Sequence, residues 1–301
     1  MGLTLVILAA GKASRYGRLK QLEPVGPGGA ALIDYTIHDA LRAGFEQIVL
    51  VVAPGLEPRF REHLERVFNR RVTAAFVAQE LGAVPKGFTV SPEREKPWGT
   101  AHAVLVAAPV LSGPFAVVNA DDYYGASSYR VLRDQLLDHP ETAALVGFEL
   151  RSTLSAHGGV SRGICEFDGH GFLTRLIEVK QIEEREGRIV GSEVDGNPIQ
   201  LLGDETASMN MWGLTPRVLD TLRHQFEEFL VRDGSDPGTE FLLSTAVGQQ
   251  VSTAEIRLRV LQSVERWFGV TFAADTPAVI ARIAKLVATG DYPEHLWKGL
   301  P

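Results

Sequence analysis

Apolar and polar residues follow a strand-then-helix pattern over the first 120 residues of the chain. Continuous apolar runs predict strands buried on both faces, at 3–9, 48–52, 72–78 and 115–120. Between these runs, apolar residues recur at helical spacing and predict helices through 33–41, 57–68 and 100–108. Strands that alternate with helices indicate right-handed βαβ units and a parallel sheet.

The pattern changes near Arg151. Short segments of period two, spaced by glycines, predict strands at 163–167, 172–179 and 208–214. The polar, glycine-bearing stretch 183–205 is expected to be a mobile hairpin or loop. Two helices are predicted near the end of the chain, at 216–231 and 277–289. These elements indicate a smaller lobe of mixed strands, followed by a closing helical segment.

Composition narrows the class of protein. The 301 residues are 45% hydrophobic, which is ample for a sizeable core, and the formal net charge is -7. An acidic chain is a poor binder of nucleic acid, so no nucleic-acid partner is expected. No run approaches the roughly 20 apolar residues of a membrane helix, so no membrane partner is expected. Cys165 is the sole cysteine, which excludes an intramolecular disulfide and favours a cytoplasmic location.

The loop after the first predicted strand carries an unusual concentration of positive charge. It reads LAAGKASRYGRLKQLEPVG from Leu8, with four cations and no acid before Glu23. Gly11 and Gly17 allow backbone amides to approach a ligand closely. The loop therefore predicts a binding site for a triphosphate, with a solvated basic loop as the alternative. The four cations are Lys12, Arg15, Arg18 and Lys20.

Two familiar nucleotide fingerprints do not match this loop. A P-loop needs a further glycine before Gly11 and a hydroxyl residue after Lys12, and both are missing. A dinucleotide fingerprint needs three spaced glycines and an acid that closes the second strand, where the chain has Ala53-Pro54-Gly55. Kinase, ATPase and dehydrogenase functions lose most of their support.

Other polar residues follow the same edge of the predicted sheet. Gln79 comes after the third strand, and Asp121 with Asp122 comes after the fourth. In parallel sheets, ligands bind outside the carboxyl ends of the strands. The sequence therefore predicts one site that joins the cationic loop, an amide and a carboxylate.

Five segments, in this order, resemble the nucleotidyltransferases that make nucleoside-diphosphate sugars. The first loop resembles the family's signature loop, and LKQLEPV is similar to the stretch found in glucose-1-phosphate thymidylyltransferases. The other segments are WGTAHAV at 98, NADDYYG at 119, LIEVK at 176 and RWFGVTFAADTP at 266.

The resemblance implies an α/β fold, namely a Rossmann-like three-layer α/β/α nucleotidyltransferase (GT-A-like) fold. It has a mostly parallel central sheet and a smaller mixed-strand sugar-binding lobe. We expect a single nucleotidyltransferase domain over 1–301, comprising a nucleotide-binding lobe (1–150), a sugar-binding lobe (151–265) and a C-terminal closing segment (266–301).

The resemblance also implies a reaction. A phosphate oxygen of a sugar 1-phosphate attacks the α-phosphorus of a nucleoside triphosphate in line, and pyrophosphate leaves with Mg²⁺. Arg15 is expected to bind the β and γ phosphates, and Lys20 the α-phosphate and the attacking phosphate. Backbone groups of Ala10, Gly11 and Ser14 are expected to contact the nucleotide, with an ordinary strand-to-helix turn as the alternative.

Further residues are expected to read the base and the sugar. Gln79, Gly99 and Thr100 match the base-reading positions, and Thr100 has the alternative role of a helix N-cap. His102, one turn into that helix, is interpreted as a packed core histidine. The sugar is expected to contact Gly163, Glu178 and Asn210; for Glu178 the alternative is a surface strand residue, and for Asn210 a buried structural amide.

The metal ligands are expected among the aspartates. Asp121 is predicted to bind Mg²⁺, with Asp122 as the less favoured register and a turn-forming pair as the alternative. Gly269 stands where the family's second metal-binding aspartate would be, so that ligand is either missing or shifted to Asp275. Asp275 precedes Thr276-Pro277 and has helix capping as its alternative role.

Other functions stay open at the level of sequence. One is cytidylyl transfer to a non-sugar alcohol phosphate, and another is a nucleotide or sugar-phosphate sensor that has lost catalysis. A glycosyltransferase of related fold is less favoured, because residues 119–122 lack an Asp-x-Asp metal motif. The sequence leaves the base and the sugar undefined, and assembly into a homo-oligomer is possible.

Overall fold

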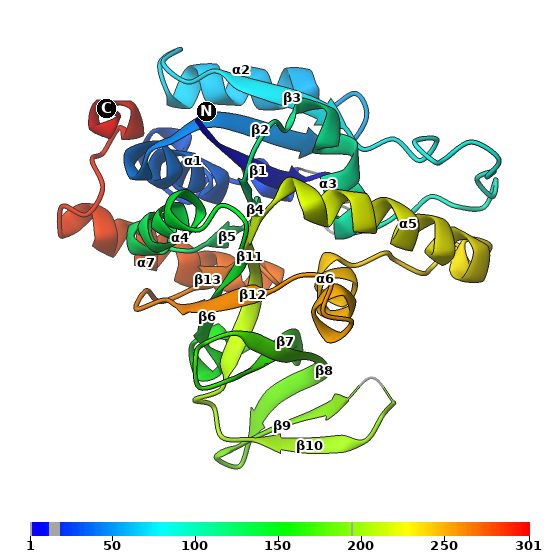
Figure 1. Ribbon diagram of the computed structural model, residues 1–301. Helices are drawn as coiled ribbons and strands as arrows, with labels where there is room; N and C mark the ends of the chain where they lie inside the picture. Colours follow the sequence, from blue (N-terminus) through cyan, green and yellow to red (C-terminus); the bar gives the residue numbers. More distant parts are fainter. Residues whose placement is uncertain (1, 12–18, 194) are drawn as a thin grey trace.

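The computed structural model describes residues 2–11, 19–193 and 195–301. A large mixed sheet runs through the molecule, with helices on both faces of its upper part and a smaller β lobe below (Figure 1). The predicted contacts of Ser14 and Arg15 lie outside the described residues.

The centre of the sheet is parallel, as the sequence pattern predicts. β1 pairs in parallel with β2 on one side and β4 on the other, and β2 pairs with β3. Along β1, Leu5 and Ile7 enter one hydrophobic cluster and Val6 enters another. This alternation explains why the strand is apolar at consecutive positions. The four strands are β1 (Leu3–Ala9), β2 (Phe45–Val52), β3 (Ala74–Ala78) and β4 (Phe115–Asn119).

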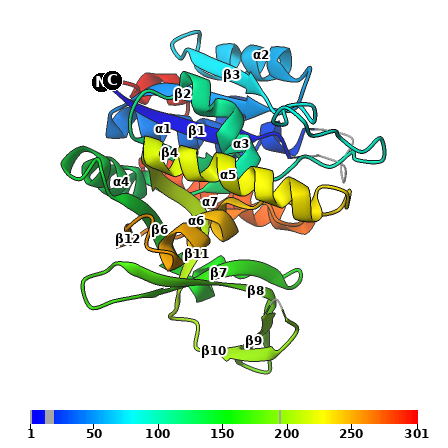
Figure 2. The ribbon, with the colours of Figure 1, turned by 45° about the vertical axis from the view of Figure 1, so that its right-hand side comes forward.

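Helices cover both faces of this sheet and complete a three-layer α/β/α arrangement. One cluster packs side chains of α1 (Leu32–Ala43), α2 (Glu57–Val67), α4 (Ala126–Asp138) and α7 (Thr276–Ala288). The other packs side chains of α3 (Thr100–Ala107), α5 (Pro216–Asp233) and α6 (Leu243–Ser252). Figure 2 shows α5 crossing in front of the sheet. Among the described helices, none combines the length and apolarity needed to cross a membrane.

The rest of the sheet is mixed, because β11 runs antiparallel to its neighbours. β11 (Thr206–Leu214) pairs antiparallel with β4, β6 (Ala143–Glu149) and β7 (Val160–Phe167), and a register shift lies between Ser208 and Met211. β12 (Leu258–Gln262) extends the sheet in parallel with β6. The parallel pairing predicted for the first 120 residues is therefore confirmed, and the antiparallel pairing begins at β11.

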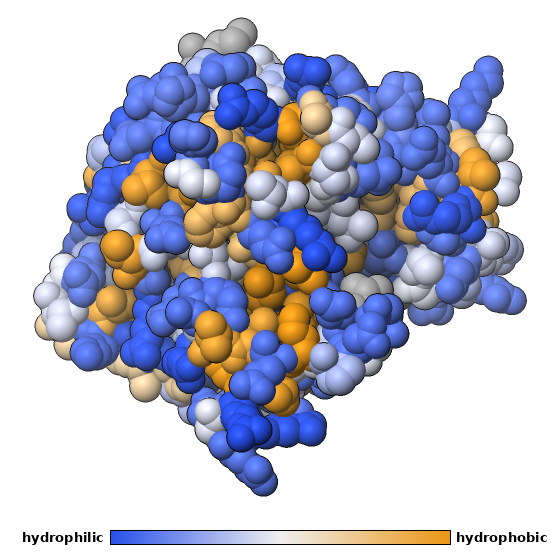
Figure 3. Space-filling view, turned by 60° about the horizontal axis from the view of Figure 1, so that its bottom comes forward, coloured by the Kyte–Doolittle hydropathy of each residue, from blue (hydrophilic) through white to orange (hydrophobic). Residues whose placement is uncertain are grey.

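The smaller lobe is an antiparallel extension of the same sheet. β7 pairs with β8, β8 with β9 and β9 with β10 around a small hydrophobic cluster of their own. Stretch 183–205, expected to be a hairpin or loop, holds the end of β8 together with β9 and β10. With the bottom of the molecule turned forward, apolar patches lie among hydrophilic side chains on the surface (Figure 3). The strands are β7 (Val160–Phe167), β8 (Leu173–Arg185), β9 (Arg188–Glu193) and β10 (Pro198–Leu201).

The closing segment returns to the site edge of the sheet. β13 (Phe268–Gly269) pairs antiparallel with β5 (Asp122–Tyr123), which directly follows β4. The ring of Phe268 stacks on Tyr123 with a centroid distance of 4.3 Å. This short pairing holds residues 268–269 against Asp121 and Asp122.

The thiol of Cys165 is expected to be chemically inert in the folded protein. The residue is buried, and burial raises the pKa of the thiol to about 12, so the reactive thiolate is scarce at neutral pH. We predict that iodoacetamide at pH 8 labels the native protein at least about 100 times more slowly than the urea-unfolded protein. Mass spectrometry of timed samples measures both rates, and equal rates would contradict the burial.

Candidate functional site

The end of β1 and the end of β4 meet at one edge, where the cationic loop returns to the sheet. The amide nitrogen of Ala120 donates to the carbonyl of Leu8, which holds the two strand ends side by side. The side chain of Gln21 donates to the carbonyl of Gly11 at 3.0 Å, so the far end of the loop is tied to its beginning. Lys20 opens the short 3₁₀ turn Lys20–Leu22 beside this contact.

Lys20 and Asp121 form an ion pair at this edge. The Nζ of Lys20 lies 2.7 Å from Oδ2 of Asp121, although the residues are 101 positions apart. The two side chains are 23% and 35% exposed. A pair this exposed adds little to stability. Its cation and carboxylate are accessible to a ligand carrying phosphate and metal.

Asp122 is buried, in contrast to its neighbour. Its Oδ2 accepts hydrogen bonds from the Nδ2 of Asn119 at 2.9 Å and from the hydroxyl of Tyr124 at 3.2 Å. Burial, and then the charge of Asp121, raise the pKa of Asp122 to about 7. The geometry thus favours Asp121 over Asp122 as the carboxylate that a ligand can reach.

The packing around Gly269 disfavours an acidic side chain next to Asp121 and Asp122. A Cβ added at this position would lie 2.5 Å from Oδ1 of Asp122 and 3.1 Å from the backbone oxygen of Asp121. The glycine allows the backbone of β13 to approach the two aspartates. The aspartate that the family would place at this position is therefore sterically disfavoured in this chain.

We predict that Gly269→Ala lowers the free energy of unfolding by about 1–3 kcal/mol, because the added methyl overlaps the buried carboxylate of Asp122. Urea denaturation measures the change. Gly113→Ala is the matched control, since an added Cβ there meets no atom within 4 Å. Equal stability of the two variants would mean that β13 does not lie against Asp122.

Asp275 is engaged in local structure. Its Oδ2 accepts a hydrogen bond from the backbone nitrogen of Phe272 at 2.6 Å, and its Oδ1 accepts one from the hydroxyl of Ser155 at 3.0 Å. Among the described residues, no group of three or more acidic, histidine or cysteine side chains is placed to hold a metal ion. These contacts favour a structural role for Asp275, in the turn before α7, over the predicted role of metal ligand.

The predicted base-reading residues lie together, but many of their contacts are with other residues of the protein. Gly99 has a φ of 111°, and a Cβ added there would lie 2.5 Å from the backbone oxygen of Phe241. The hydroxyl of Thr100 accepts a hydrogen bond from the backbone nitrogen of Leu243 at 2.9 Å, at the start of α6. Gly99 occupies the N-cap position of α3. The alternative role of Thr100 as the N-cap of α3 is therefore wrong. Its hydroxyl instead accepts a hydrogen bond from the first residue of α6.

The long segment 80–98 is anchored at several points. The indole nitrogen of Trp98 donates to the carbonyl of Leu81 at 2.9 Å. The guanidinium carbon of Arg94 lies 3.5 Å from the centroid of the Trp98 ring, and its nitrogens donate to the backbone oxygens of Asp236 and Thr239. This segment is thereby fixed to the connection between α5 and α6.

The predicted sugar-binding residues share one stretch of the antiparallel sheet. Gly163 on β7 faces Glu178 on β8 and Ser208 on β11 in the register of the strands. Burial raises the pKa of Glu178. Asn210 lies in the register shift of β11 with a φ of 58°, and its Oδ1 accepts a hydrogen bond from the indole of Trp212 at 3.2 Å. The structure pairs Gly163 with Glu178, places Asn210 two residues along β11 from Ser208 and gives Asn210 a partly structural role.

Arg162 is a buried cation that the sequence analysis did not single out. Its guanidinium donates to the hydroxyl and the carbonyl of Thr153, and it lies 5.0 Å from the ring centroid of Trp267. Burial lowers its pKa to about 10, and the charges of Asp122 and Glu178 oppose this shift. The side chain stays cationic at neutral pH, as a positive charge that interacts with Asp122 and Glu178. The available signal was an arginine among the apolar residues Val160, Ile164 and Cys165 of this strand.

Comparison with known proteins places this geometry in a family. A family model described as the MobA-like NTP transferase domain matches residues 5–178. The chain belongs to this family. The match includes the cationic loop, Gln79, Asp121, Gly163 and Glu178, and it ends before Asn210. The nucleotidyltransferase family predicted from the sequence motifs is confirmed at the level of this NTP transferase domain.

One curated relative and two solved structures extend the comparison. The chain is 28% identical to the bifunctional protein GlmU of Geotalea uraniireducens (strain Rf4) over 192 residues, 62% of this chain and 36% of that protein. It therefore spans about a third of the length of this relative.

The solved structures resemble this member of the NTP transferase family over most of its length. The inositol-1-phosphate CTP transferase from T. maritima has a TM-score of 0.61 at 14% identity, covering 94% of this chain and 97% of that chain. A UDP-glucose pyrophosphorylase complexed with UDP-glucose has a TM-score of 0.61 at 16% identity, covering 95% and 99%. At such identities the likeness confirms the predicted fold.

Proposed function

We propose that this protein transfers a nucleoside monophosphate from a nucleoside triphosphate to a sugar 1-phosphate, giving a nucleoside-diphosphate sugar and pyrophosphate. The observation that carries the proposal is the ion pair between Lys20 and Asp121 at the joint end of β1 and β4, beside Gly11. Membership of the NTP transferase family supports it, as does the likeness to a pyrophosphorylase that binds UDP-glucose.

In this proposal, charge neutralisation and positioning supply most of the rate enhancement. Lys20 contacts the α-phosphate and the attacking phosphate, and a unit charge about 4 Å away contributes about 4 kcal/mol at an effective dielectric of about 20. Arg15 is assigned the β and γ phosphates. Backbone groups of Ala10, Gly11 and Ser14 contact the nucleotide.

Mg²⁺ is the cofactor of this proposal, and the residues present fit it. Mg²⁺ in phosphate-transfer sites is held by one or two carboxylates, with substrate phosphates and water as the other ligands. Asp121 supplies one accessible carboxylate. The atoms packed around Gly269 would clash with a second acidic side chain at that position. When bound, the ion neutralises charge on the phosphates.

The remaining assignments form the outer part of the proposed site. Gln79, Gly99 and Thr100 lie on the base side, and Gly163, Glu178 and Asn210 on the sugar side. The division into lobes at 1–150, 151–265 and 266–301, a cytoplasmic location and assembly into a homo-oligomer stay predictions.

Pyrophosphate release tests the proposal. The purified protein with Mg²⁺ is incubated with each nucleoside triphosphate against a set of sugar 1-phosphates and alcohol phosphates. We expect release with one sugar 1-phosphate well above all alcohol phosphates. A sensor would release none, yet its melting temperature would rise with ligand.

A second candidate function is cytidylyl transfer to an alcohol phosphate. The likeness to the inositol-1-phosphate CTP transferase favours it, since its TM-score equals that of the pyrophosphorylase. Release that requires CTP and an alcohol phosphate would replace the first proposal by this one.

A further inference from the structure

The amide of Gln79 is held in one orientation by two partners. Its Nε2 lies 2.9 Å from the carbonyl oxygen of Gly99 and 3.2 Å from Nδ1 of His102. A carbonyl oxygen only accepts hydrogen bonds, so the amide must turn its NH₂ group toward Gly99. Both N–H groups are then used. Within the described part of the chain, Oε1 of Gln79 receives no hydrogen bond and is the group left for a ligand.

His102 has a defined tautomer that matches this arrangement. Its Nε2 lies 2.8 Å from the carbonyl oxygen of Ala83, so Nε2 carries the hydrogen and Nδ1 is a bare acceptor. The side chain is 1% exposed, and burial lowers its pKa, which keeps the ring neutral. A neutral ring with this tautomer accepts the N–H of Gln79.

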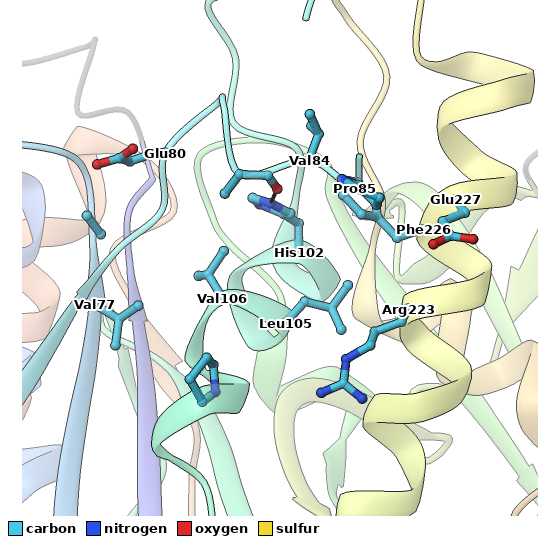
Figure 4. Close-up of a pocket in the computed structure, with 13 residues that line it drawn as sticks. Val77, Glu80, Val84, Pro85, His102, Leu105, Val106, Arg223, Phe226 and Glu227 are labelled. Carbon is cyan, nitrogen blue, oxygen red and sulfur yellow. Dashed lines mark hydrogen bonds between the residues drawn. The ribbon is translucent and has the colours of Figure 1, made fainter. Parts of the chain in front are cut away.

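The ring of His102 is held in place by packing as well as by hydrogen bonds. It packs on Phe226 of α5 with a centroid distance of 4.9 Å. Figure 4 shows the ring at the wall of a pocket of about 530 Å³, between α3, α5 and the loop that carries Val84 and Pro85. The ring of His102 is thus held in one orientation by the loop at Ala83 and by Phe226 of α5. Its Nδ1 in turn orients the amide of Gln79.

We propose that His102 is a positioning residue for the nucleotide. It holds the amide of Gln79 with the oxygen toward the base, so the base is recognised through one of its own N–H groups. In pyrimidines these donors are the ring N–H of uracil or thymine and the amino group of cytosine. The proposal rests on the proposed function, because it assumes that a nucleotide base lies at Gln79.

Two substitutions separate the two hydrogen bonds of the ring. In His102→Asn, the amide oxygen takes the place of Nδ1 and still accepts from Gln79. In His102→Gln, the longer amide reaches Ala83 in place of Nε2 and leaves Gln79 without its acceptor. Calorimetry with UTP, dTTP, CTP and GTP in the presence of Mg²⁺ gives Kd for each variant. For the nucleotide that wild type binds best, we expect Kd within about threefold of wild type for His102→Asn and about tenfold weaker for His102→Gln.

A double-mutant cycle completes the test. Gln79→Ala is expected to weaken binding about tenfold, and His102→Gln in that background to add nothing, because its effect passes through Gln79. Equal costs of His102→Gln with and without Gln79, or Kd values that follow the melting temperatures of the variants, would overturn the positioning role. A wild type that binds none of the four nucleotides would overturn the proposed function itself.

Discussion

Replacement of Lys20 by alanine is expected to lower turnover about 100-fold, which corresponds to about 2.7 kcal/mol of lost transition-state stabilisation. The side chain is the one described cation of the first loop, and it already contacts a carboxylate at the site edge. Its amine is placed to meet negative charge that develops on the phosphates. Initial rates of pyrophosphate release, measured with saturating substrates, give the change.

The fold should be unaffected by this change, because the ion pair is exposed. Lys96→Ala is the matched control, since Lys96 pairs with Glu240 at 2.8 Å on the surface, in the same kind of contact. Both variants should melt close to wild type, and only Lys20→Ala should lose turnover. Near-normal rates for Lys20→Ala would remove the residue from the site.

Asp121→Asn is expected to lower turnover about 100-fold or more, because the amide keeps the shape of the carboxylate and loses the charge that attracts Mg²⁺. A weakened metal site should respond to metal concentration. We therefore expect the rate of the variant to keep rising with Mg²⁺ at concentrations where wild type is saturated. Magnesium titrations of the initial rate measure this.

Asp134→Asn is the control for this variant, since Asp134 pairs with Arg133 at 2.9 Å on the surface. It should match wild type in rate and in magnesium dependence. If Asp121→Asn also matched wild type, the metal would have to be held elsewhere. A rate loss without a changed magnesium dependence would give Asp121 a role in orienting Lys20.

The site edge could be predicted because it depends on local patterns and on one rule of sheet topology. The alternation of Leu5, Val6 and Ile7 between two clusters is visible as a continuous apolar run. Parallel neighbours end at the same edge, which brings Lys20 to Asp121 across 101 residues. Sequence reasoning therefore found the region of the site and the chemistry of this pair.

The close packing around the base-reading residues depends on contacts between distant parts of the chain. Gly99 is needed because the backbone of Phe241 lies against it, and Thr100 caps a helix that begins 143 residues later. Segment 232–242 carries no strong strand or helix pattern from which these contacts could be predicted. The orientation of Gln79 likewise depends on His102 and could be seen only in three dimensions.

Some elements were missed although their signals are present in the sequence. Helix α4 carries Tyr129, Leu132 and Leu136 at helical spacing, after the breaker Gly125. Strand β6 is a nearly continuous apolar run. β13 is different, because a pair of residues has no period to detect and is a strand only by its contact with β5.

The central claim is that the α-phosphorus of a nucleoside triphosphate is transferred to an acceptor phosphate at the edge formed by Lys20 and Asp121. Phosphorus NMR of the complete reaction with the best substrate pair tests it most directly. We predict a new diphosphodiester and pyrophosphate in equal amounts, with neither accumulating in the Lys20→Ala reaction over the same time. Nucleoside diphosphate or inorganic phosphate as the main product of the wild-type protein would contradict nucleotidyl transfer.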